Sequence, residues 1–374
     1  MKDESLTEVI KGEEEYYTDD SIYNITSYGT DMMLGQIASM YKAGDIERPD
    51  LQRNFVWTKK EASRFIDSIL LGLPVPSVFF AKDNENRLII VDGLQRITSI
   101  VNFIDGTFSG DGTPFKLTKS ESIYAAWRGK AYEDLSEAQQ RAIRTYSLHA
   151  IIFEQKKPSD NSGMYQIFER INTGGRILKS QEIRNCIYHG SFNSMLRELN
   201  QNEVWRTILN LPTPDPRMGD VELILRFLAF SDLPTLPEFS EHQISLVKFL
   251  NSYMEKNREL SDQTAAELSK RFVDVITYLN RNIGQHVFRT AKVKDGGYSW
   301  ARKVNPVVFD SICTATYLFS KEETLPEKNL LSAYEHLITD PTYIEVTKQR
   351  TTNITNIKKR INLSCKALYG CEIL

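Results

Sequence analysis

Asp92, Gly93, Gln95 and Arg96 are the residues of this sequence whose types and spacing best suit phosphate chemistry. The planar guanidinium of Arg96 offers donors that match phosphate, and a glycine lets the backbone approach a ligand closely. The carboxylate of Asp92 is an acceptor for a hydroxyl, a water molecule or a magnesium ion. These four residue types are suited to a site that binds a phosphate group.

A strand, a tight turn and a helix are predicted to position these side chains. The apolar run 88–91 is typical of a strand, and apolar residues recur at helical spacing through 97–104. Gln95 and Arg96 then lie in the first helical turn, beside unpaired backbone N–H groups and the positive end of the helix dipole. Local physics alone favours a simpler interpretation, in which Asp92 caps the turn and Arg96 pairs with a surface carboxylate.

Three motifs in order, within residues 28–230, resemble the pattern of one protein family. They are Pro49–Trp57, Asp92–Thr98, and Ile167–Gly175 followed by Leu178 and Gln181–Asn185. The first is similar to Pro-x-(Phe/Tyr)-Gln-Arg-x-x-x-Trp, and the second to Asp-Gly-Gln-Gln-Arg-hydrophobic-Thr. This family is related to the ParB/sulfiredoxin-like fold and forms the N-terminal half of GmrSD-type modification-dependent restriction enzymes. Leu94 departs from the pattern, because the family carries Gln there.

The resemblance implies one composite nucleotide pocket between the two halves of the chain. Asp92, Gln95 and Arg96 are implied as catalytic residues, with Gln95 positioning the attacking water. Contacts to nucleotide or phosphate are implied for Gln52, Arg53, Gly93, Thr98, Arg170, Asn172, Glu182 and Arg184. A magnesium ion is the implied cofactor, held through Asp92, and no other metal site is expected because the five histidines form no paired motif.

Two of these segments have structural alternatives. Arg53 could stack on Trp57 or pair with a nearby acid, although two separated arginines converging on one site are a less common accident than either alone. The glycines at 174–175 could be a plain helix C-cap, and local physics favours that interpretation for the third motif.

The periodicity predicts an α+β protein in which a small ParB/sulfiredoxin-like mixed α/β N-terminal domain packs on a mainly α-helical C-terminal domain. The predicted divisions are an acidic flexible tail (1–25), the ParB-like domain (26–157) and the helical domain (158–374). Predicted N-terminal helices are 31–43, 62–70, 97–104 and 136–146, and predicted strands are 78–81, 88–91, 115–117 and 149–153. Beyond 157, apolar stripes at helical spacing predict helices, one of them beginning at Asn305-Pro306.

Composition narrows the possible partners. The net charge of −3 gives no overall attraction to nucleic acid, so such a contact needs a local patch. Tyr298 and Trp300 could stack on a base or pack on their own domain. Cations also gather near the C-terminus, where a solvated helix face is the simpler interpretation and a phosphate-tracking patch the alternative. They are Lys348, Arg350, Lys358, Lys359, Arg360 and Lys366.

Cysteine usage and hydropathy indicate a cytoplasmic protein. The four cysteines form no Cys-x-x-Cys pair, which suits free thiols in a reducing compartment. No signal peptide and no apolar run of membrane-spanning length is recognisable, so no membrane partner is expected.

The function implied is a nucleotide-binding, nucleoside triphosphate-hydrolysing module of a DNA-directed restriction or anti-phage defence system. One alternative is a DNA-binding or DNA-cleaving ParB-like protein, and another is a catalytically inactive regulatory partner, for which Leu94 is the argument. Endonuclease activity is less favoured, because no candidate for the family's His-Asn-His nuclease domain is found. The absence of a Gly-x-x-x-x-Gly-Lys-Ser/Thr sequence excludes a P-loop. DNA or a partner nuclease are further implied partners.

Overall fold

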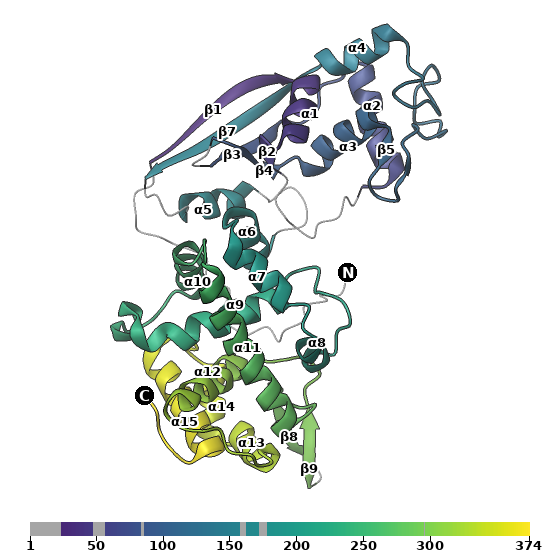
Figure 1. The fold of residues 1–374 in the computed structure, drawn as a ribbon. Coiled ribbons are helices and arrows are strands. Elements are labelled where there is room, and N and C mark those ends of the chain that lie inside the picture. Colours follow the sequence, from purple (N-terminus) through teal and green to yellow (C-terminus); the bar gives the residue numbers. More distant parts are fainter. Residues whose placement is uncertain (1–23, 48–56, 84–85, 158–161, 172–177, 295) are drawn as a thin grey trace. The chain divides into compact units, whose positions relative to one another are not determined.

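The computed structural model describes residues 24–47, 57–83, 86–157, 162–171, 178–294 and 296–374. These residues form two compact units, each with its own elements (Figure 1). The N-terminal unit contains the described residues up to Leu178 together with Asn185–Ile187, and the C-terminal unit contains Lys179–Arg184 and Tyr188–Leu374. The mixed α/β character of the first unit and the helical character of the second confirm the predicted fold class.

A five-stranded mixed sheet is the centre of the N-terminal unit. Its strands are β1 (Asn24–Met33), β2 (Ile46–Glu47), β3 (Val78–Lys82), β4 (Leu88–Asp92) and β7 (Ser147–Lys157). They lie in the order β1-β7-β3-β4-β2, with β1–β7 and β3–β4 antiparallel and β7–β3 and β4–β2 parallel. The antiparallel pair β3–β4 coincides with the strands predicted at 78–81 and 88–91.

The edge strand β1 differs from what the sequence predicts for this segment. The prediction extends a tail to residue 25 and begins a helix at Asp31. The helix begins instead at Leu34, and Asp31 belongs to the strand. Most residues of β1 are exposed or half-buried, so the strand lacks the apolar alternation by which strands are recognised. Its backbone pairs with β7 from Asn24 to Met33, and this long-range ladder defines it.

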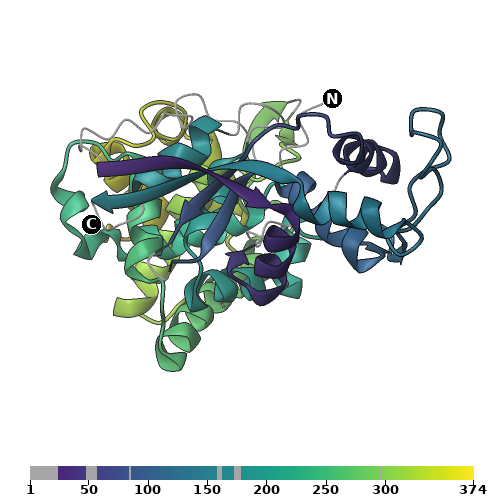
Figure 2. The same cartoon turned by 90° about the horizontal axis from the view of Figure 1, so that it is seen from above.

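Four helices of this unit gather on one side of the sheet (Figures 1 and 2). They are α1 (Leu34–Ala43), α2 (Lys59–Leu70), α3 (Leu94–Asp105) and α4 (Glu137–Thr145). Their apolar residues form one buried core with Val78, Phe80 and Ile90 of the central strands. Gly44 and Gly106 end α1 and α3 in the left-handed conformation, as their positions after apolar stripes predict.

The sheet's other face is covered within the same unit by α5 (Ser162–Ile171), which contacts β4. The first turn of α5 is hydrogen-bonded to β7, because Met164 N donates to Gln155 Oε1 at 2.9 Å. Phe79 and Phe153 stack on this face, with ring centroids 6.1 Å apart. The sequence predicts a change of periodicity at Lys157, just before α5. This helix nevertheless belongs to the N-terminal unit together with the sheet.

The strand predicted at 115–117 is wrong. The short strands there are β5 (Thr107–Phe108) and β6 (Thr113–Pro114), which pair only with each other. Phe115 N and Leu117 N donate to the carbonyls of Gly106 and Lys130 in irregular backbone. Both side chains are buried, so their alternation reflects packing against the core and not a ladder.

The C-terminal unit is built from helices. Its elements are α7 (Ser191–Leu199), α8 (Glu203–Leu209), α9 (Gly219–Asp232), η1 (Leu233–Thr235), η2 (Pro237–Ser240), α10 (Leu246–Lys256), α11 (Asp262–Ile283), β8 (Ala291–Lys294), β9 (Gly297–Trp300), α12 (Pro306–Glu322), α13 (Leu331–Thr339), α14 (Pro341–Lys348) and α15 (Ile354–Tyr369), and α6 (Ser180–Ile187) is divided between the units. The predicted cap is confirmed, because Asn305 Oδ1 accepts from Val307 N and Val308 N.

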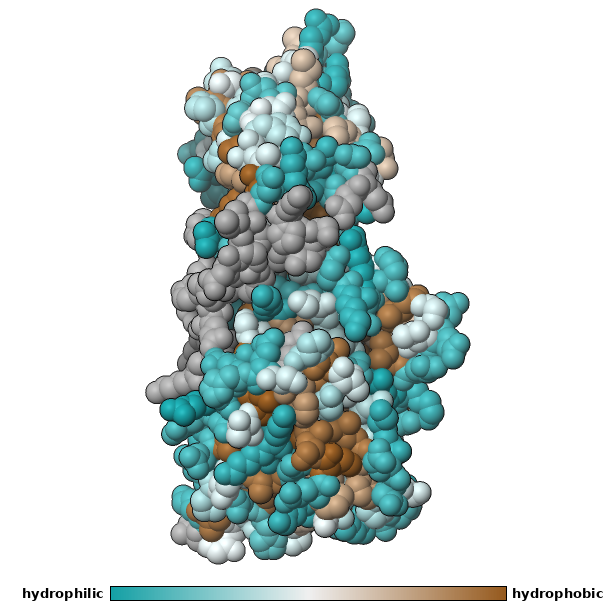
Figure 3. Space-filling view, turned by 90° about the vertical axis from the view of Figure 1, so that its left-hand side faces the viewer, coloured by the Kyte–Doolittle hydropathy of each residue, from teal (hydrophilic) through white to brown (hydrophobic). Residues whose placement is uncertain are grey.

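The β8–β9 hairpin is the element of this unit that periodicity does not predict. It stands at one edge of the helices (Figure 1). In the face shown in Figure 3, apolar areas of the C-terminal unit alternate with hydrophilic side chains.

Candidate functional site

A β-bulge at the end of β4 sets the direction of Asp92. Phe80 pairs with Ile90, but Phe79 pairs with Asp92, so β4 carries one extra residue at this point. Paired residues of a ladder share a face, and the bulge therefore directs Asp92 to the side of Phe79, away from the helical core. This is the face on which α5 contacts β4.

Gly93 is required by the turn that joins β4 to α3. Its φ of +103° lies in the left-handed region, and a Cβ there would lie 2.5 Å from Val78 Cγ1. Ile97 N donates to Gly93 O at 2.9 Å, which closes the first turn of α3. Gly93 occupies the N-cap position and has no side chain that could cap α3, so the first backbone N–H groups receive no cap from this residue.

Arg96 and Asp92 form an ion pair, with Arg96 Nη2 2.5 Å from Asp92 Oδ2. The Arg96 side chain is 13% exposed and the Asp92 side chain 44% exposed. Asp92 therefore does not cap the turn, contrary to one part of the simpler interpretation. The other part agrees with the structure, because Arg96 pairs with a partly exposed carboxylate. The pair places a guanidinium and a partly solvated carboxylate together at the start of α3.

Gln95 connects two of the three motifs. Its Oε1 accepts a hydrogen bond of 3.2 Å from Trp57 N, and Trp57 is the last residue of the first motif. The Trp57 ring packs edge-on to Phe65 at a centroid distance of 5.7 Å, which anchors that motif's end on α2. Gln52 and Arg53, predicted to contact phosphate, lie outside the described residues.

Leu94 and Thr98 face inward. Leu94 is partly buried and packs against the apolar core of the N-terminal unit. Thr98 is 5% exposed in the second turn of α3. The position at which the chain departs from the family pattern is therefore a packing position in this structure.

The described residues at the start of the third motif, Ile167–Ile171, lie on α5. Arg170 is exposed, while its neighbour Glu169 is half-buried. Burial raises the pKa of Glu169 above its ordinary value, and the positive charge of Arg170 partly offsets this effect. Asn172, predicted to bind nucleotide, lies outside the described residues.

Glu182 has partners within the C-terminal unit. It is 2% exposed and accepts from Lys179 N at 2.7 Å, and Arg217 Nε lies 3.1 Å from its carboxylate. The carboxylate therefore joins the start of α6 to the segment that leads into α9.

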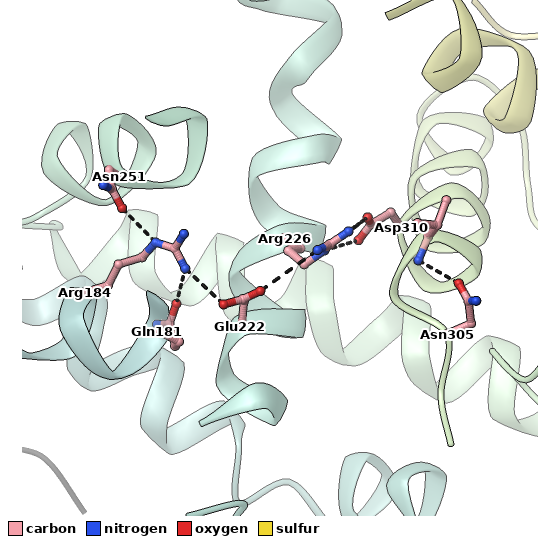
Figure 4. A network of polar contacts seen from close by, with 8 residues as sticks. Gln181, Arg184, Glu222, Arg226, Asn251, Asn305 and Asp310 are labelled. Atoms are coloured by element: carbon pink, nitrogen blue, oxygen red, sulfur yellow. Dashed lines mark hydrogen bonds and ion pairs between the residues drawn. The ribbon is translucent and has the colours of Figure 1, made fainter. Parts of the chain in front are cut away.

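Arg184 belongs to a chain of buried polar contacts in the same unit (Figure 4). It is 1% exposed and donates to Asn251 Oδ1 at 2.8 Å, and to Gln181 Oε1 and Glu222 Oε2 at 3.1 Å. Its contacts join α6 to α9 and α10. The ligand contacts implied for Glu182 and Arg184 stay predictions beside these structural roles.

A histidine–carboxylate pair lies on the same sheet face as Asp92. His149 Nδ1 is 2.8 Å from Asp31 Oδ1, and both side chains are exposed. His149 is two residues from Ile151, which pairs with Phe79, so the face is shared. Sequence reasoning missed this pair, because 118 residues separate its members and β1 was not expected.

The described residues contain no group of three or more His, Cys, Asp or Glu side chains that could hold a metal ion. Asp92 is the carboxylate of the candidate site, and the ion pair occupies its Oδ2. A magnesium ion is often held by one or two carboxylates together with substrate phosphates. The candidate site therefore fits a magnesium ion held by Asp92 together with substrate phosphates better than an ion held by protein ligands alone.

Residues 34–189 match the model of the GmrSD restriction endonuclease N-terminal domain. The match confirms the predicted resemblance and indicates a restriction- or defence-system module. No curated protein and no solved structure matches the chain. Across the described residues, no helix is both long and apolar enough to cross a membrane.

Proposed function

We propose that this chain is a nucleotide-binding and nucleoside triphosphate-hydrolysing module of a restriction or anti-phage defence system. The observation that supports the proposal is the arrangement at the end of β4, where Gly93 joins the strand to a helix start that has no N-cap side chain. There Arg96 lies beside a partly solvated Asp92. Donors at a helix N-terminus and a guanidinium together form an anion site.

Phosphate would bind at the start of α3. The backbone N–H groups of the first helical turn point along the helix axis toward it, and the absence of Cβ at Gly93 permits a close approach. Arg96 would add charge-assisted hydrogen bonds, each contributing about 1.5–3 kcal/mol. Arg53 and Arg170 are proposed as further cations at the same phosphates.

The Asp92–Arg96 ion pair would have to open for Arg96 to bind a phosphate. A bound phosphate competes with Asp92 for the guanidinium, because both are anions that accept from the same donors. As Arg96 turns to the phosphate, the carboxylate of Asp92 becomes available to orient water or to contact a magnesium ion. Magnesium would neutralise charge that develops on the phosphates during hydrolysis.

Gln95 is proposed to position the attacking water. Its hydrogen bond from Trp57 N, 3.2 Å long, holds the side-chain amide in the first turn of α3. Restricting a polar group in advance lowers the entropic cost of aligning water with a phosphate.

The test measures affinity by calorimetry and phosphate release for each nucleoside triphosphate, using wild type, Arg96→Ala and Arg96→Lys. Arg96→Ala is expected to weaken binding about 10- to 150-fold, from the loss of about 1.5–3 kcal/mol. Arg96→Lys is expected to restore only part of this affinity, because an ammonium lacks the planar fork.

Arg87→Ala is the matched control. Arg87 also forms ion pairs in this unit, with Asp83 at 3.0 Å and Glu47 at 2.5 Å, but it precedes the other end of β4. This variant is expected to keep nucleotide affinity. Equal binding by wild type and Arg96→Ala would contradict the proposal, and no affinity for any triphosphate would favour the alternative that this site contacts DNA phosphate.

A further inference from the structure

The segment 291–303, which contains the β8–β9 hairpin, concentrates positive charge in a chain whose net charge is −3. It holds Lys292, Lys294, Arg302 and Lys303 against one acid, Asp295. All four cationic residues are exposed, and none forms an ion pair with any residue that the structure describes. A local group of cations without acidic partners creates a positive potential that attracts an external anion.

The ladder of the hairpin places two of these cations on one face. Lys292 pairs with Ser299 and Lys294 with Gly297, so small residues lie opposite both lysines. Residues two apart in a strand are about 6.6–6.8 Å apart and point the same way. The lysines can therefore contact successive anionic groups of one extended partner.

The opposite face of the hairpin carries the apolar pair Val293 and Tyr298. Val293 is 69% exposed, more than any other large apolar side chain of the described residues, and Tyr298 is 37% exposed. The hairpin therefore presents cations on one face and an exposed apolar pair on the other.

The base of the hairpin is firmly anchored. The Trp300 ring stacks between His286, at a centroid distance of 4.2 Å, and Tyr334, at 5.9 Å, nearly parallel to both. Ala301 N donates to Thr290 O at 2.8 Å and closes the strand pair. Trp300 therefore packs on its own unit, and Tyr298 is the aromatic residue left for an external contact.

We propose that the β8–β9 hairpin is a docking surface for duplex DNA, with Lys292, Lys294, Arg302 and Lys303 contacting backbone phosphates. A two-stranded antiparallel ribbon has the width that the major groove admits. DNA is favoured over other polyanions because residues 34–189 match a restriction endonuclease domain. The proposal rests on that assignment to a DNA-directed system and does not depend on nucleotide hydrolysis at Arg96.

The test is fluorescence anisotropy of a labelled duplex with the full chain over a series of salt concentrations. Each phosphate contact contributes about −0.9 to the slope of log K against log salt. Lys292→Ala/Lys294→Ala is expected to reduce the magnitude of that slope by about 1.8 and to weaken binding at least tenfold at low salt. Lys292→Arg/Lys294→Arg is expected to keep wild-type binding.

The matched control is Lys348→Ala/Lys359→Ala, which removes two exposed charges from other elements of the same unit. It is expected to keep the wild-type slope, and an equal loss in the control would overturn the proposal in favour of the C-terminal patch. No duplex binding by wild type, or wild-type binding by the alanine hairpin variant, would also overturn it. Tighter binding to polyglutamate than to duplex at equal ionic strength would assign the hairpin to an acidic protein.

Arg96→Ala separates this inference from the nucleotide proposal. The variant is expected to bind duplex as wild type does, even if its nucleotide affinity is lost. A parallel loss of duplex affinity in Arg96→Ala and in the hairpin variant would mean that DNA binds at the β4–α3 turn, which overturns the hairpin assignment.

Discussion

At the residue scale, the turn between β4 and α3 depends on one glycine and one ion pair. Gly93 has a backbone conformation that side chains disfavour, and its missing Cβ leaves room for Val78. Arg96 and Asp92 then hold each other at the helix start. Each feature has a measurable consequence that does not require knowledge of the ligand.

Gly93→Ala is expected to destabilise the protein more than Gly44→Ala does. Both glycines have positive φ, so each substitution costs about 1–2 kcal/mol of backbone free energy. A Cβ at Gly44 meets nothing within 4 Å, whereas at Gly93 it meets Val78 Cγ1 at 2.5 Å, which adds about 1–3 kcal/mol of overpacking. Urea unfolding of the two variants measures the difference, and equal losses would argue against the tight approach.

Leu94→Gln is expected to lower stability without raising turnover. The side chain packs against the core, so an amide at this position would lose solvation instead of reaching a water at the phosphate. Placing it there costs about 1–3 kcal/mol. Single-turnover phosphate release and thermal melting on the same samples test this, with Leu94→Met as a packing control. Faster hydrolysis by Leu94→Gln would show that this position contacts the reacting water.

At the element scale, buried ion pairs join the helices of the C-terminal unit. Arg226 of α9 donates to Asp310 of α12 at 2.6 Å, with exposed fractions of 3% and 1%, and Arg226 also lies 4.0 Å from Glu222 (Figure 4). Partners this deeply buried cannot be replaced singly, because the remaining charge stays without water.

Asp310→Ala is therefore expected to lower the free energy of unfolding by about 3–5 kcal/mol. Asp274→Ala, which breaks the exposed pair with Lys270 on α11, is expected to cost at most about 1 kcal/mol. Chemical denaturation followed by circular dichroism gives both values. A small loss in Asp310→Ala would mean that water reaches Arg226 in the folded state.

At the scale of the whole molecule, the chain consists of two units with separate cores. The proposed nucleotide contacts at Asp92–Arg96 lie in the N-terminal unit, and the hairpin proposed to bind DNA lies in the C-terminal unit. Ligands that bind one unit stabilise that unit by mass action.

Scanning calorimetry is expected to resolve two unfolding transitions. A nucleoside triphosphate at 100 times its Kd should stabilise the N-terminal transition by about 2.7 kcal/mol, and duplex DNA should act on the other. Arg96→Ala should remove the nucleotide shift alone. A single transition that moves as a whole with either ligand would show that the units unfold together.

Local patterns in the sequence determined much of the N-terminal unit. The run 88–91, followed by Asp92-Gly93 and a 3.6-residue period, predicted strand, turn and helix, and β4, Gly93 and α3 are found there. The hairpin β3–β4 and the Asn305 cap were equally recognisable, because the interacting residues are close in sequence. The match over 34–189 supports the family that the motifs indicated.

Only the tertiary structure decided the rest, because the decisive contacts join distant residues. β1 is a strand through its ladder with β7, and Asp31 meets His149 through the same pairing. The bulge opposite Phe79 directs Asp92, and the core on which Leu94 packs comes from several elements. Periodicity indicates which residues are buried. The residues that each of them contacts depend on the tertiary fold, which brings distant segments together.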